Sequence, residues 1–356
     1  MEAFVLPVAA AMAARGHRVH LATGDRPAMS TFAEGTQVVP MNRGMSPKHD
    51  ARALALWVSY LRVLQPDMVV AGTPKASLLC LVAARIARVP TRVYIIHGAV
   101  WDGAVGKRRA LLESTERIAI AASTHQVAVS QSMADLVRSR GLCRRTPFVV
   151  GAGSFCGVDT ERFTPTTSAS LEPPTIIFVG RLNRDKGIDT LLRVLDTVRQ
   201  HVDVSLTIVG PLDETAPPDA TTVSDVIHHL SVNWTGPVDD VVGHLRRASA
   251  FVFPTAREGL AQSLLEAQSA GIPVVAWRVT GVVDAVEDGV TGILISPGDE
   301  NAMASAVLRL LRDAGTRQQM AIAGRTRMVE NFEQRSVVVK NVAFLEGCLE
   351  EATNHG

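Results

Sequence analysis

Short apolar, β-branched segments alternate with helix-forming segments along almost the whole chain. Residues 175–179, for example, form such an apolar run, and a helical pattern follows at residues 188–199. An apolar run of this length, bounded by polar residues, is typical of a strand buried on both faces. Strands that alternate with helices form parallel sheets covered by helices on both sides. The sequence therefore predicts an α/β chain of doubly wound, Rossmann-like sheets.

The alternation extends through both halves of the chain. Strands are predicted at residues 18–22, 36–40, 67–71, 91–96, 125–129, 175–179, 204–209, 250–253 and 274–276. Helices are predicted at residues 51–64, 75–87, 105–122, 132–140 and 188–199. The apolar opening segment, residues 3–13, has no basic residues before it and carries Glu2 instead, so it predicts an amphipathic helix ending at Gly16 and not a signal peptide.

The 356 residues are enough for two domains of ordinary size. Pro, Thr and Ser are concentrated at residues 164–174, which is typical of a linker. We therefore predict one Rossmann-like domain over residues 1–165 and a second over residues 166–334. A last helix, from about residue 335, is predicted within residues 335–356.

Composition excludes several classes of protein. A content of 47% hydrophobic and 20% charged residues is typical of a globular chain. The net charge of +1 and the 4% aromatic content argue against nucleic-acid binding. The four cysteines are scattered, which indicates reduced thiols in a cytoplasmic protein and no metal cluster. No run of about 18 apolar residues is present to span a bilayer.

Two glutamates, Glu258 and Glu266, stand eight positions apart (266 − 258 = 8). Glu258 follows the predicted strand at residues 250–253, and open α/β sheets bind ligands at the carboxyl ends of their strands. The backbone N–H groups of Gly259 and Leu260 are predicted to open the next helix, where they can meet an anion. Glu266 lies further along that helix and can accept hydrogen bonds from sugar hydroxyls. On the spacing alone, a loop glutamate that caps a helix and a solvated helix glutamate remain the simpler interpretation.

A second motif connects the predicted strand at residues 175–179 to the helix that follows it. It reads Gly-Arg-Leu-Asn-Arg-Asp-Lys-Gly at residues 180–187. Arg181 offers a planar fork of donors and Lys186 a point charge, and both suit the oxygens of a diphosphate. Asp185 is expected to cap the helix through its carboxylate. The alternative is a solvated turn.

The two motifs, in this order, resemble those of the retaining GT-B glycosyltransferases of family four, which use nucleotide-sugar donors. The chain matches the G-R-L-x-x-x-K-G pattern at each fixed position and also the E-x7-E pattern. The resemblance implies that Arg181 and Lys186 bind the donor diphosphate, with the helix N-terminus at Gly259 and Leu260. It also implies that Glu258 contacts the donor hexose and Glu266 the nucleotide ribose.

His97 follows the predicted strand at residues 91–96 and precedes Gly98. The family has a His-Gly at this place, and the resemblance implies that this histidine contacts the donor sugar near the reacting carbon. A lone histidine with a structural role is the alternative.

Two further segments indicate a branch of the family. Residues 153–163 resemble its G-S-x-x-G-V-D-x-x-R-F linker, and residues 280–292 resemble the capsule-assembly branch. That branch includes transferases that add a hexose or N-acetylhexosamine to an undecaprenyl-diphosphate sugar. The resemblance implies an acceptor-binding first domain, a nucleotide-sugar-binding second domain and a last helix that crosses back to the first. It also implies a UDP-sugar donor, with GDP left open, retention of configuration, no cofactor and no bound metal, since no D-x-D motif is present.

Basic residues beside apolar ones indicate that the protein binds a membrane surface. Lys107, Arg108 and Arg109 open one predicted helix and are followed by Ala-Leu-Leu, and a second basic cluster lies at residues 138–145. Such segments can seat a protein on anionic lipid. We expect a cytoplasmic protein, peripheral on the inner face of the cell membrane. The alternative is a solvated helix face.

One element of the family pattern has no counterpart. The family's first domain begins with a central strand and a Gly-rich loop, whereas residues 1–4 already resemble the helix that follows them. We therefore expect a sheet without its first strand, through a start site assigned too late or a truncated gene. The competing interpretations are an impaired homologue that acts as a binding protein and a GT-B sugar-nucleotide epimerase. The epimerase shares the architecture but not the two motifs.

Overall fold

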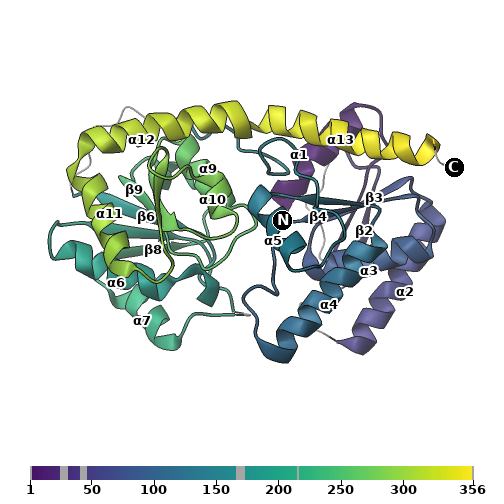
Figure 1. The fold of residues 1–356 in the computed structure, drawn as a ribbon, viewed down its shortest axis with the longest axis horizontal. Coiled ribbons are helices and arrows are strands. Elements are labelled where there is room, and N and C mark those ends of the chain that lie inside the picture. The colour runs from purple at the N-terminus through teal and green to yellow at the C-terminus, as the bar shows by residue number, and fades with distance from the viewer. Residues whose placement is uncertain (1, 25–30, 41–45, 166–172, 215, 355–356) are drawn as a thin grey trace. The chain divides into compact units, whose positions relative to one another are not determined.

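The protein folds into two compact units, shown in the computed structural model of Figure 1. The structure describes residues 2–24, 31–40, 46–165, 173–214 and 216–354. Unit 1 comprises Met1–Gly157 and Arg335–Gly356, and unit 2 comprises Val158–Gln334. The division after Gly157 lies eight residues before the one expected after residue 165 (165 − 157 = 8). Most of the expected linker, residues 166–172, lies outside the described residues.

Residues 158–165 belong to unit 2 because an arginine of that unit holds them. Arg325 Nη1 donates to the carbonyl oxygens of Thr160 at 2.7 Å and Phe163 at 2.9 Å. The N–H of Val158 donates to the carbonyl of Phe332 at 2.8 Å. These backbone contacts place the change of unit before the Pro- and Thr-rich segment and not within it.

The strands of unit 1 form two separate parallel sheets. One contains β1 (His20–Thr23) and β2 (Gly35–Val38), and the other has the order β3 (Met68–Ala71), β4 (Thr91–Ile96), β5 (His125–Ala128). Within the described part of the chain, no strand pairs with the second edge of β1 or of β3. Helix α1 (Glu2–Ala14) lies where the sequence predicted a helix, but it is apolar almost throughout and therefore not amphipathic.

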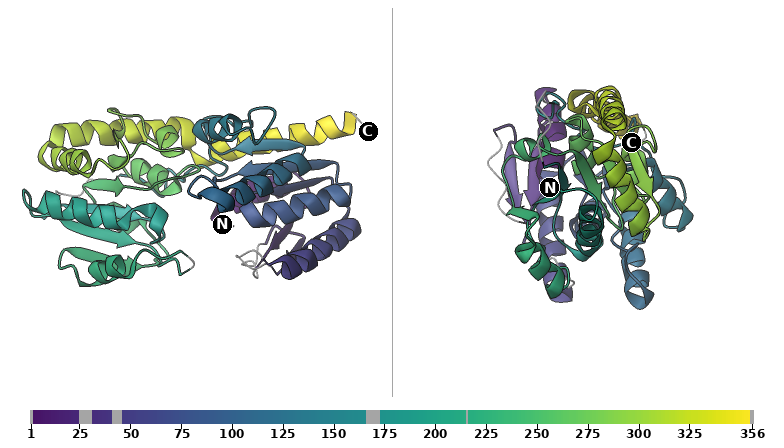
Figure 2. Two further views of the ribbon diagram at one scale, coloured as in Figure 1. Left: turned by 60° about the horizontal axis from the view of Figure 1, so that its bottom comes forward. Right: turned by 90° about the vertical axis from the view of Figure 1, so that its left-hand side faces the viewer.

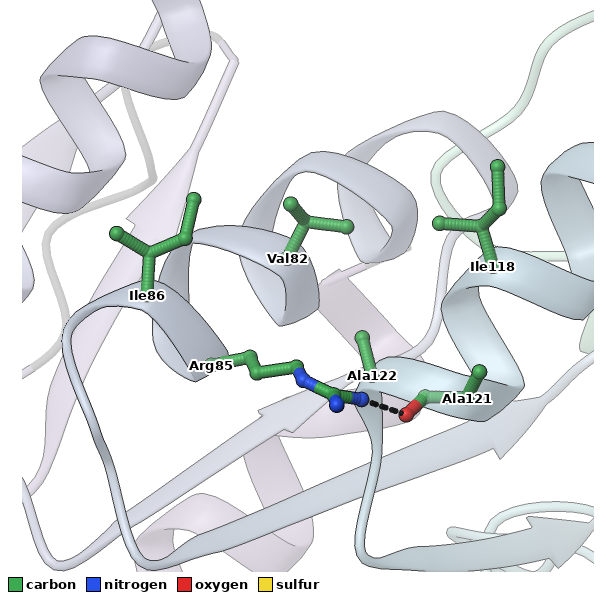
Figure 3. Close-up of a pocket in the computed structure, with 6 residues that line it drawn as sticks. All are labelled: Val82, Arg85, Ile86, Ile118, Ala121 and Ala122. Atoms are coloured by element: carbon green, nitrogen blue, oxygen red, sulfur yellow. Dashed lines mark hydrogen bonds between the residues drawn. The ribbon is translucent and has the colours of Figure 1, made fainter.

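Helices cover these sheets. They are α1, α2 (Pro47–Leu64), α3 (Pro74–Ile86), α4 (Gly106–Ala122), α5 (Gln131–Ser139) and the returning α13 (Gln334–Asn354). Figures 1 and 2 show α2, α3 and α4 side by side, with α3 packed against both neighbours. Arg85 of α3 donates to the carbonyl of Ala121 in α4 at 2.6 Å (Figure 3). α13 is held to unit 1 by stacking of Phe344 on Phe148, with ring centroids 5.2 Å apart.

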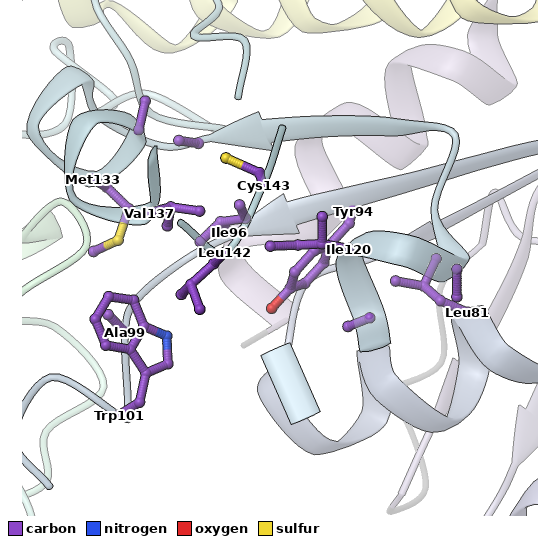
Figure 4. Packing of buried hydrophobic residues seen from close by; sticks show 14 residues of the cluster. Leu81, Tyr94, Ile96, Ala99, Trp101, Ile120, Met133, Val137, Leu142 and Cys143 are labelled. Atoms are coloured by element: carbon purple, nitrogen blue, oxygen red, sulfur yellow. The ribbon is translucent and has the colours of Figure 1, made fainter. Parts of the chain in front are cut away.

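A buried acid, Glu116 of α4, lies against the apolar core of unit 1 beside β4, and Figure 4 shows that core. Tyr94 of β4 donates its hydroxyl proton to Glu116 Oε1 of α4 at 2.9 Å. Burial raises the pKa of Glu116 to about 7, although the bond from Tyr94 opposes the rise. Trp101, fully buried, packs in the same cluster. A side chain of this size contributes roughly 2–3 kcal/mol of stability through its burial.

Unit 2 contains one six-stranded parallel sheet in the order β11-β10-β9-β6-β7-β8. The strands are β6 (Thr175–Val179), β7 (Ser205–Val209), β8 (Val232–Gly236), β9 (Ala250–Phe253), β10 (Val274–Trp277) and β11 (Gly292–Ile295). Every residue of β9 and of β10 is buried, which explains their uninterrupted apolar sequences. The strand order runs one way from β6 through β8 and the other way from β9 through β11, so it changes direction between β6 and β9.

The helices of unit 2 lie on both sides of its strands (Figure 2). They are α6 (Ile188–Arg199), α7 (Ala220–His228), α8 (Val242–Leu245), α9 (Gln262–Ser269), α10 (Val282–Ala285), α11 (Glu300–Arg312) and α12 (Ala314–Arg327). α6 packs beside α11, and α9 packs beside α12. The strands and helices predicted at the residue ranges above all form, with ends that differ by a few residues.

Candidate active site

The point where the strand order of unit 2 changes direction carries both sequence motifs. In open parallel sheets, ligands bind at the carboxyl ends of the strands at such a point. The loop at residues 180–187 follows β6, and the loop at residues 254–261 follows its neighbour β9. The topology therefore brings the two loops to the same edge of the sheet, although more than 70 residues separate Lys186 from Glu258.

Two ion pairs and a buried hydroxyl join these loops. Lys186 Nζ donates to Glu258 Oε1, and Arg257 Nη2 donates to Asp185 Oδ2. Thr255 is fully buried, and its hydroxyl lies 3.2 Å from both the carbonyl of Asp185 and Glu258 Oε1. The charges predicted to contact a diphosphate and a sugar therefore face each other at the edge of the sheet.

Glycines allow the loops to approach this closely. Gly187 has φ = +66°, and a Cβ there would lie 2.2 Å from the carbonyl oxygen of Pro254. Gly281, at the start of α10, has φ = +76°, and its Cβ would lie 2.4 Å from the carbonyl oxygen of Gly259. Both positions combine a left-handed backbone with a backbone neighbour that cannot move away. The loops after β6 and β10 thus pack directly on the loop after β9.

Arg181 is positioned by a carboxylate from a third loop. Its Nη1 donates to Asp213 Oδ2 at 2.6 Å, and Asn183 Nδ2 lies 3.4 Å from the same oxygen. Asp213 is buried in the loop after β7, whereas 59% of the Arg181 side chain is exposed. A buried carboxylate that holds one edge of the guanidinium leaves exposed N–H groups available for a ligand.

Two local predictions were wrong. Asp185 does not cap α6, because Gly187 occupies the N-cap position and the Asp185 carboxylate pairs with Arg257 instead. α9 begins at Gln262 and not at Gly259, since Ala261 adopts an extended backbone with ψ = 102° at the N-cap. The close approach of Gly281 to the Gly259 carbonyl keeps this segment in a loop. Gly259 and Leu260 remain beside Glu258, but their N–H groups belong to a loop and not to the first turn of a helix.

Glu266 lies on α9, one turn after its start. Burial raises the pKa of its carboxyl to about 7, against the opposing charge of Arg162 and a hydrogen bond with Gln262. A carboxyl group with this pKa is present in both protonation states near neutral pH. It can therefore donate as well as accept hydrogen bonds there.

His97 belongs to unit 1, whereas the other predicted site residues all belong to unit 2. It follows β4, and its ring meets Phe155 edge-on with centroids 6.2 Å apart. Burial lowers the pKa of His97 to about 4, so its imidazole is neutral at pH 7. A Cβ at Gly72 would lie 2.6 Å from His97 Cδ2, so only glycine at residue 72 leaves the ring in this place.

The structure adds site residues that the sequence did not single out: Asp213, Thr255 and Arg257. The sequence offers one signal for Asp213: it is a carboxylate that lies a few residues after the strand predicted at residues 204–209. Thr255 and Arg257 lie inside the second motif loop, but nothing in their spacing indicates their partners.

The part of the chain that the structure describes contains no group of three or more His, Cys, Asp or Glu side chains placed to hold a metal ion. No described helix is both long enough and apolar enough to cross a bilayer.

Solved structures share this fold over nearly the whole chain. Sucrose-phosphate synthase from Thermosynechococcus elongatus superposes with a TM-score of 0.81 at 20% identity, covering 98% of this chain and 93% of the synthase. HepE from Anabaena, in complex with UDP and glucose, gives 0.78 at 19% identity over 97% of this chain and 95% of its own. The architecture is therefore that of the GT-B glycosyltransferases, with two Rossmann-like units.

Sequence comparison identifies the family. Residues 1–162 match the model of Glycosyltransferase Family 4, and residues 173–313 match that of Glycosyl transferases group 1. A GDP-mannose-dependent α-(1-6)-phosphatidylinositol monomannoside mannosyltransferase of Mycobacterium tuberculosis is 30% identical over 70% of this chain and 75% of its own length. The capsular polysaccharide biosynthesis glycosyltransferase CapM of Staphylococcus aureus is 28% identical over 90% of this chain and 87% of its own. The chain belongs to glycosyltransferase family 4.

Proposed function

We propose that the protein transfers a hexose or N-acetylhexosamine from a nucleotide sugar to a saccharide acceptor, with retention of the anomeric configuration. One observation carries the proposal: Arg181, Lys186 and Glu258 gather at the edge of the sheet where the loops after β6 and β9 meet. Unit 2 is then the nucleotide-sugar-binding domain and unit 1 the acceptor-binding domain.

The charges at this edge suit the leaving group of the reaction. Breaking the bond between the sugar and the diphosphate leaves additional negative charge on the phosphate oxygens. Arg181, fixed by Asp213, and Lys186 stabilise that charge, and fixed donors act most strongly where charge develops in the transition state. In this proposal the two side chains carry that role without a bound metal or cofactor.

The remaining site residues act on the sugar and the nucleotide. Glu258 binds the donor hexose, and Glu266 binds the ribose hydroxyls. His97, neutral at pH 7, stabilises the reacting sugar as it approaches an oxocarbenium ion, without adding a second positive charge. The leaving phosphate itself takes the proton of the acceptor hydroxyl on the same face of the sugar. That route retains configuration and requires no protein base.

The relatives support a role in assembling surface polysaccharide. The likeness to CapM over most of both chains supports a capsular or similar polysaccharide, and we propose a UDP-sugar as the donor and an undecaprenyl-diphosphate-linked saccharide as the acceptor. The mycobacterial relative is named for GDP-mannose, so GDP-mannose is the competing donor. A lipid-linked acceptor requires that the protein work at a membrane, and we propose that this membrane surface is anionic.

The test is release of nucleotide from UDP-sugars and from GDP-mannose, with and without a lipid-linked saccharide acceptor. We expect release that depends on acceptor and is lost in Glu258→Ala, and a product whose anomeric proton coupling in NMR matches that of the donor sugar. Inverted coupling would contradict retention. Turnover of the nucleotide sugar that is equally fast without acceptor would instead support an epimerase.

A further inference from the structure

The loop at residues 150–157 places an aromatic ring against His97. Phe155 is buried, and its ring meets the His97 imidazole edge-on, with centroids 6.2 Å apart and ring planes at 87°. Gly72 limits the same imidazole, since a Cβ there would lie 2.6 Å from His97 Cδ2 and 2.8 Å from Nε2. Phe155 stands at one of the two positions that the G-S-x-x-G-V-D-x-x-R-F pattern leaves open. The ring contact is therefore a feature of this chain and not of the pattern.

Hydrogen bonds tie this loop to the end of β4, the strand that His97 follows. The N–H of Val129, directly after β5, donates to the carbonyl of Ile96 at 3.3 Å. The N–H of Ser154 donates in turn to the carbonyl of Val129 at 2.8 Å. His97 and Phe155 therefore each follow a residue of one hydrogen-bonded row. A shift of Ser154 within this row moves the Phe155 ring relative to His97.

The backbone of the loop is held in an unfavourable conformation at Ser154. In the part of the chain that the structure describes, the only residues other than glycine with a positive φ are Ser154, at +67°, Gln65 and Arg88. Gln65 and Arg88 lie at the C-terminal ends of α2 and α3, where left-handed backbone is common. Ser154 ends no helix, and its hydroxyl accepts a hydrogen bond from the N–H of Gly157 at 2.9 Å. Strained backbone that local contacts hold in place is concentrated at functional sites.

A buried asparagine of α13 contacts the same residue. Asn341 Nδ2 donates to the carbonyl of Ser154 at 3.3 Å and to that of Val337, in its own helix, at 3.0 Å. Asn341 Oδ1 is buried, and the described residues offer it no hydrogen-bond partner. An unpaired buried oxygen lowers stability relative to an apolar side chain of the same shape. The bond to Ser154 is thus the contribution that an apolar residue at this position would lack.

We propose that Phe155 is a positioning residue for His97, and that Asn341 fixes Phe155 through the carbonyl of Ser154. Phe155 holds the imidazole in the orientation in which it meets the reacting sugar. Asn341 holds Ser154, and with it the Phe155 ring, at the end of β4. Both residues act through His97 and touch no substrate. The inference rests on the proposed function for the role of His97, but the contact itself is tested in the free protein.

Two variants remove the two contacts while keeping the size of each side chain close to that of the wild type. Phe155→Leu removes the ring edge, and Asn341→Leu removes the amide donor. Phe148→Leu is the matched control for the first, because the Phe148 ring also lies in unit 1 but stacks on Phe344. Thr353→Val is the control for the second, because it removes a 3.0 Å bond from another α13 side chain to the backbone of that helix. Circular dichroism verifies that each variant folds.

NMR of the free protein reports the His97 ring without any substrate. Carbon–proton spectra are recorded with ring-labelled histidine, and the His97 signals are identified by their absence in His97→Gln. We expect these signals to move in Phe155→Leu and in Asn341→Leu, and to keep their positions in both controls. His97 signals in Asn341→Leu that coincide with those of the wild type would overturn the inference.

Kinetics of sugar transfer report what the contact does. In Phe155→Leu, kcat should fall roughly ten- to a hundredfold, because a misplaced group loses transition-state stabilisation. The KM for the donor should stay near its wild-type value, since Arg181 and Lys186 belong to unit 2. Asn341→Leu should lower kcat less, and should lower it no further in a protein that already carries Phe155→Leu, because the two residues act through one contact.

Additive losses of kcat in the double variant would overturn the inference, and so would a raised KM with unchanged kcat. An equal loss of kcat in Phe148→Leu would also overturn it, because any ring of unit 1 would then serve. If the wild type transfers no sugar from UDP-sugars or GDP-mannose while the His97 signals respond as expected, the proposed function is wrong and the positioning of His97 by Phe155 stands.

Discussion

Lys186 and Glu258, on the loops that follow β6 and β9, form an ion pair with each other across the point where the strand order of unit 2 reverses. The lysine is predicted to bind the donor diphosphate and the glutamate the donor sugar. In the free protein each therefore neutralises the other. Both side chains are mostly buried, so this neutralisation removes the cost of two desolvated, unpaired charges.

Because of this ion pair, we expect Glu258→Gln to affect the affinity for UDP and the affinity for UDP-sugar differently. In this variant Lys186 loses its charged partner, so the affinity for UDP should stay unchanged or rise a few-fold. The lysine can then pair with the phosphates without giving up an ion pair to a carboxylate. The affinity for UDP-sugar relative to UDP should fall about tenfold, the loss of one charge-assisted hydrogen bond. Calorimetric titration with both ligands measures the two affinities. A variant that lost UDP and UDP-sugar in equal proportion would show that Glu258 does not contact the sugar.

Asp213 is predicted to act through Arg181. In Asp213→Asn the guanidinium keeps a neutral acceptor but loses the charge that fixes it, so the affinity for nucleoside diphosphate should fall roughly three- to tenfold. Asp219→Asn is the matched control, since Asp219 also pairs with an arginine of the same loop, Arg184, but on the exposed surface. Equal affinities for nucleoside diphosphate in the two variants would show that Asp213 does not contribute to the binding site.

Gly187 is predicted to be required for the contact between the two loops. Gly187→Ala adds the cost of a left-handed backbone to a clash with the Pro254 carbonyl, so it should lower the free energy of unfolding by more than about 2 kcal/mol. Gly236→Ala has nearly the same φ, +69°, but open space around the new Cβ, and should cost only about 1 kcal/mol. Denaturant titration of both variants measures the difference. Similar losses of unfolding free energy in the two variants would mean that the two motif loops separate at little cost.

Glu116 predicts a specific dependence of stability on pH. Its raised pKa lets the folded chain keep a proton that the unfolded chain releases, so the free energy of unfolding falls as pH rises from 4.5 to about 7. Glu116→Gln keeps an acceptor for Tyr94 but does not titrate. The variant should match the wild type below this range and exceed it by about 3 kcal/mol above it. Parallel pH profiles for the two proteins would contradict a neutral Glu116 in the core.

The sequence was sufficient to place Arg181, Lys186 and Glu258 because each follows an apolar strand, and the carboxyl ends of parallel strands share one edge. It could not pair Lys186 with Glu258 or Asp185 with Arg257, because those pairings require β6 and β9 to be neighbours, and strand order does not follow from strand position in the sequence. The predicted start of α9 failed for a similar reason. Gly281, from another loop, approaches Gly259, and local helix signals carry no information about that contact.

Asp213 illustrates a different gap between sequence and structure. A carboxylate after a strand was visible in the sequence, but its partner depends on β7 lying beside β6. In unit 1, the predicted strands β1 to β5 all form, yet they divide into two sheets. The alternation of strands and helices predicts which strands form, but it did not predict this division, since strand pairing does not follow from the hydrophobic pattern of each strand.

The assignment of the donor site is tested most directly by calorimetric titration of the wild type and of an Arg181→Ala, Lys186→Ala double variant with UDP-glucose, UDP-N-acetylglucosamine and GDP-mannose. Arg184→Ala is the control, because Arg184 lies in the same loop but pairs only at the surface. We predict that the wild type and the control bind at least one of these donors, and that the double variant binds it at least a hundredfold more weakly, through the loss of two charge-assisted contacts. Unchanged affinity in the double variant would place the donor elsewhere and contradict the assignment of this site.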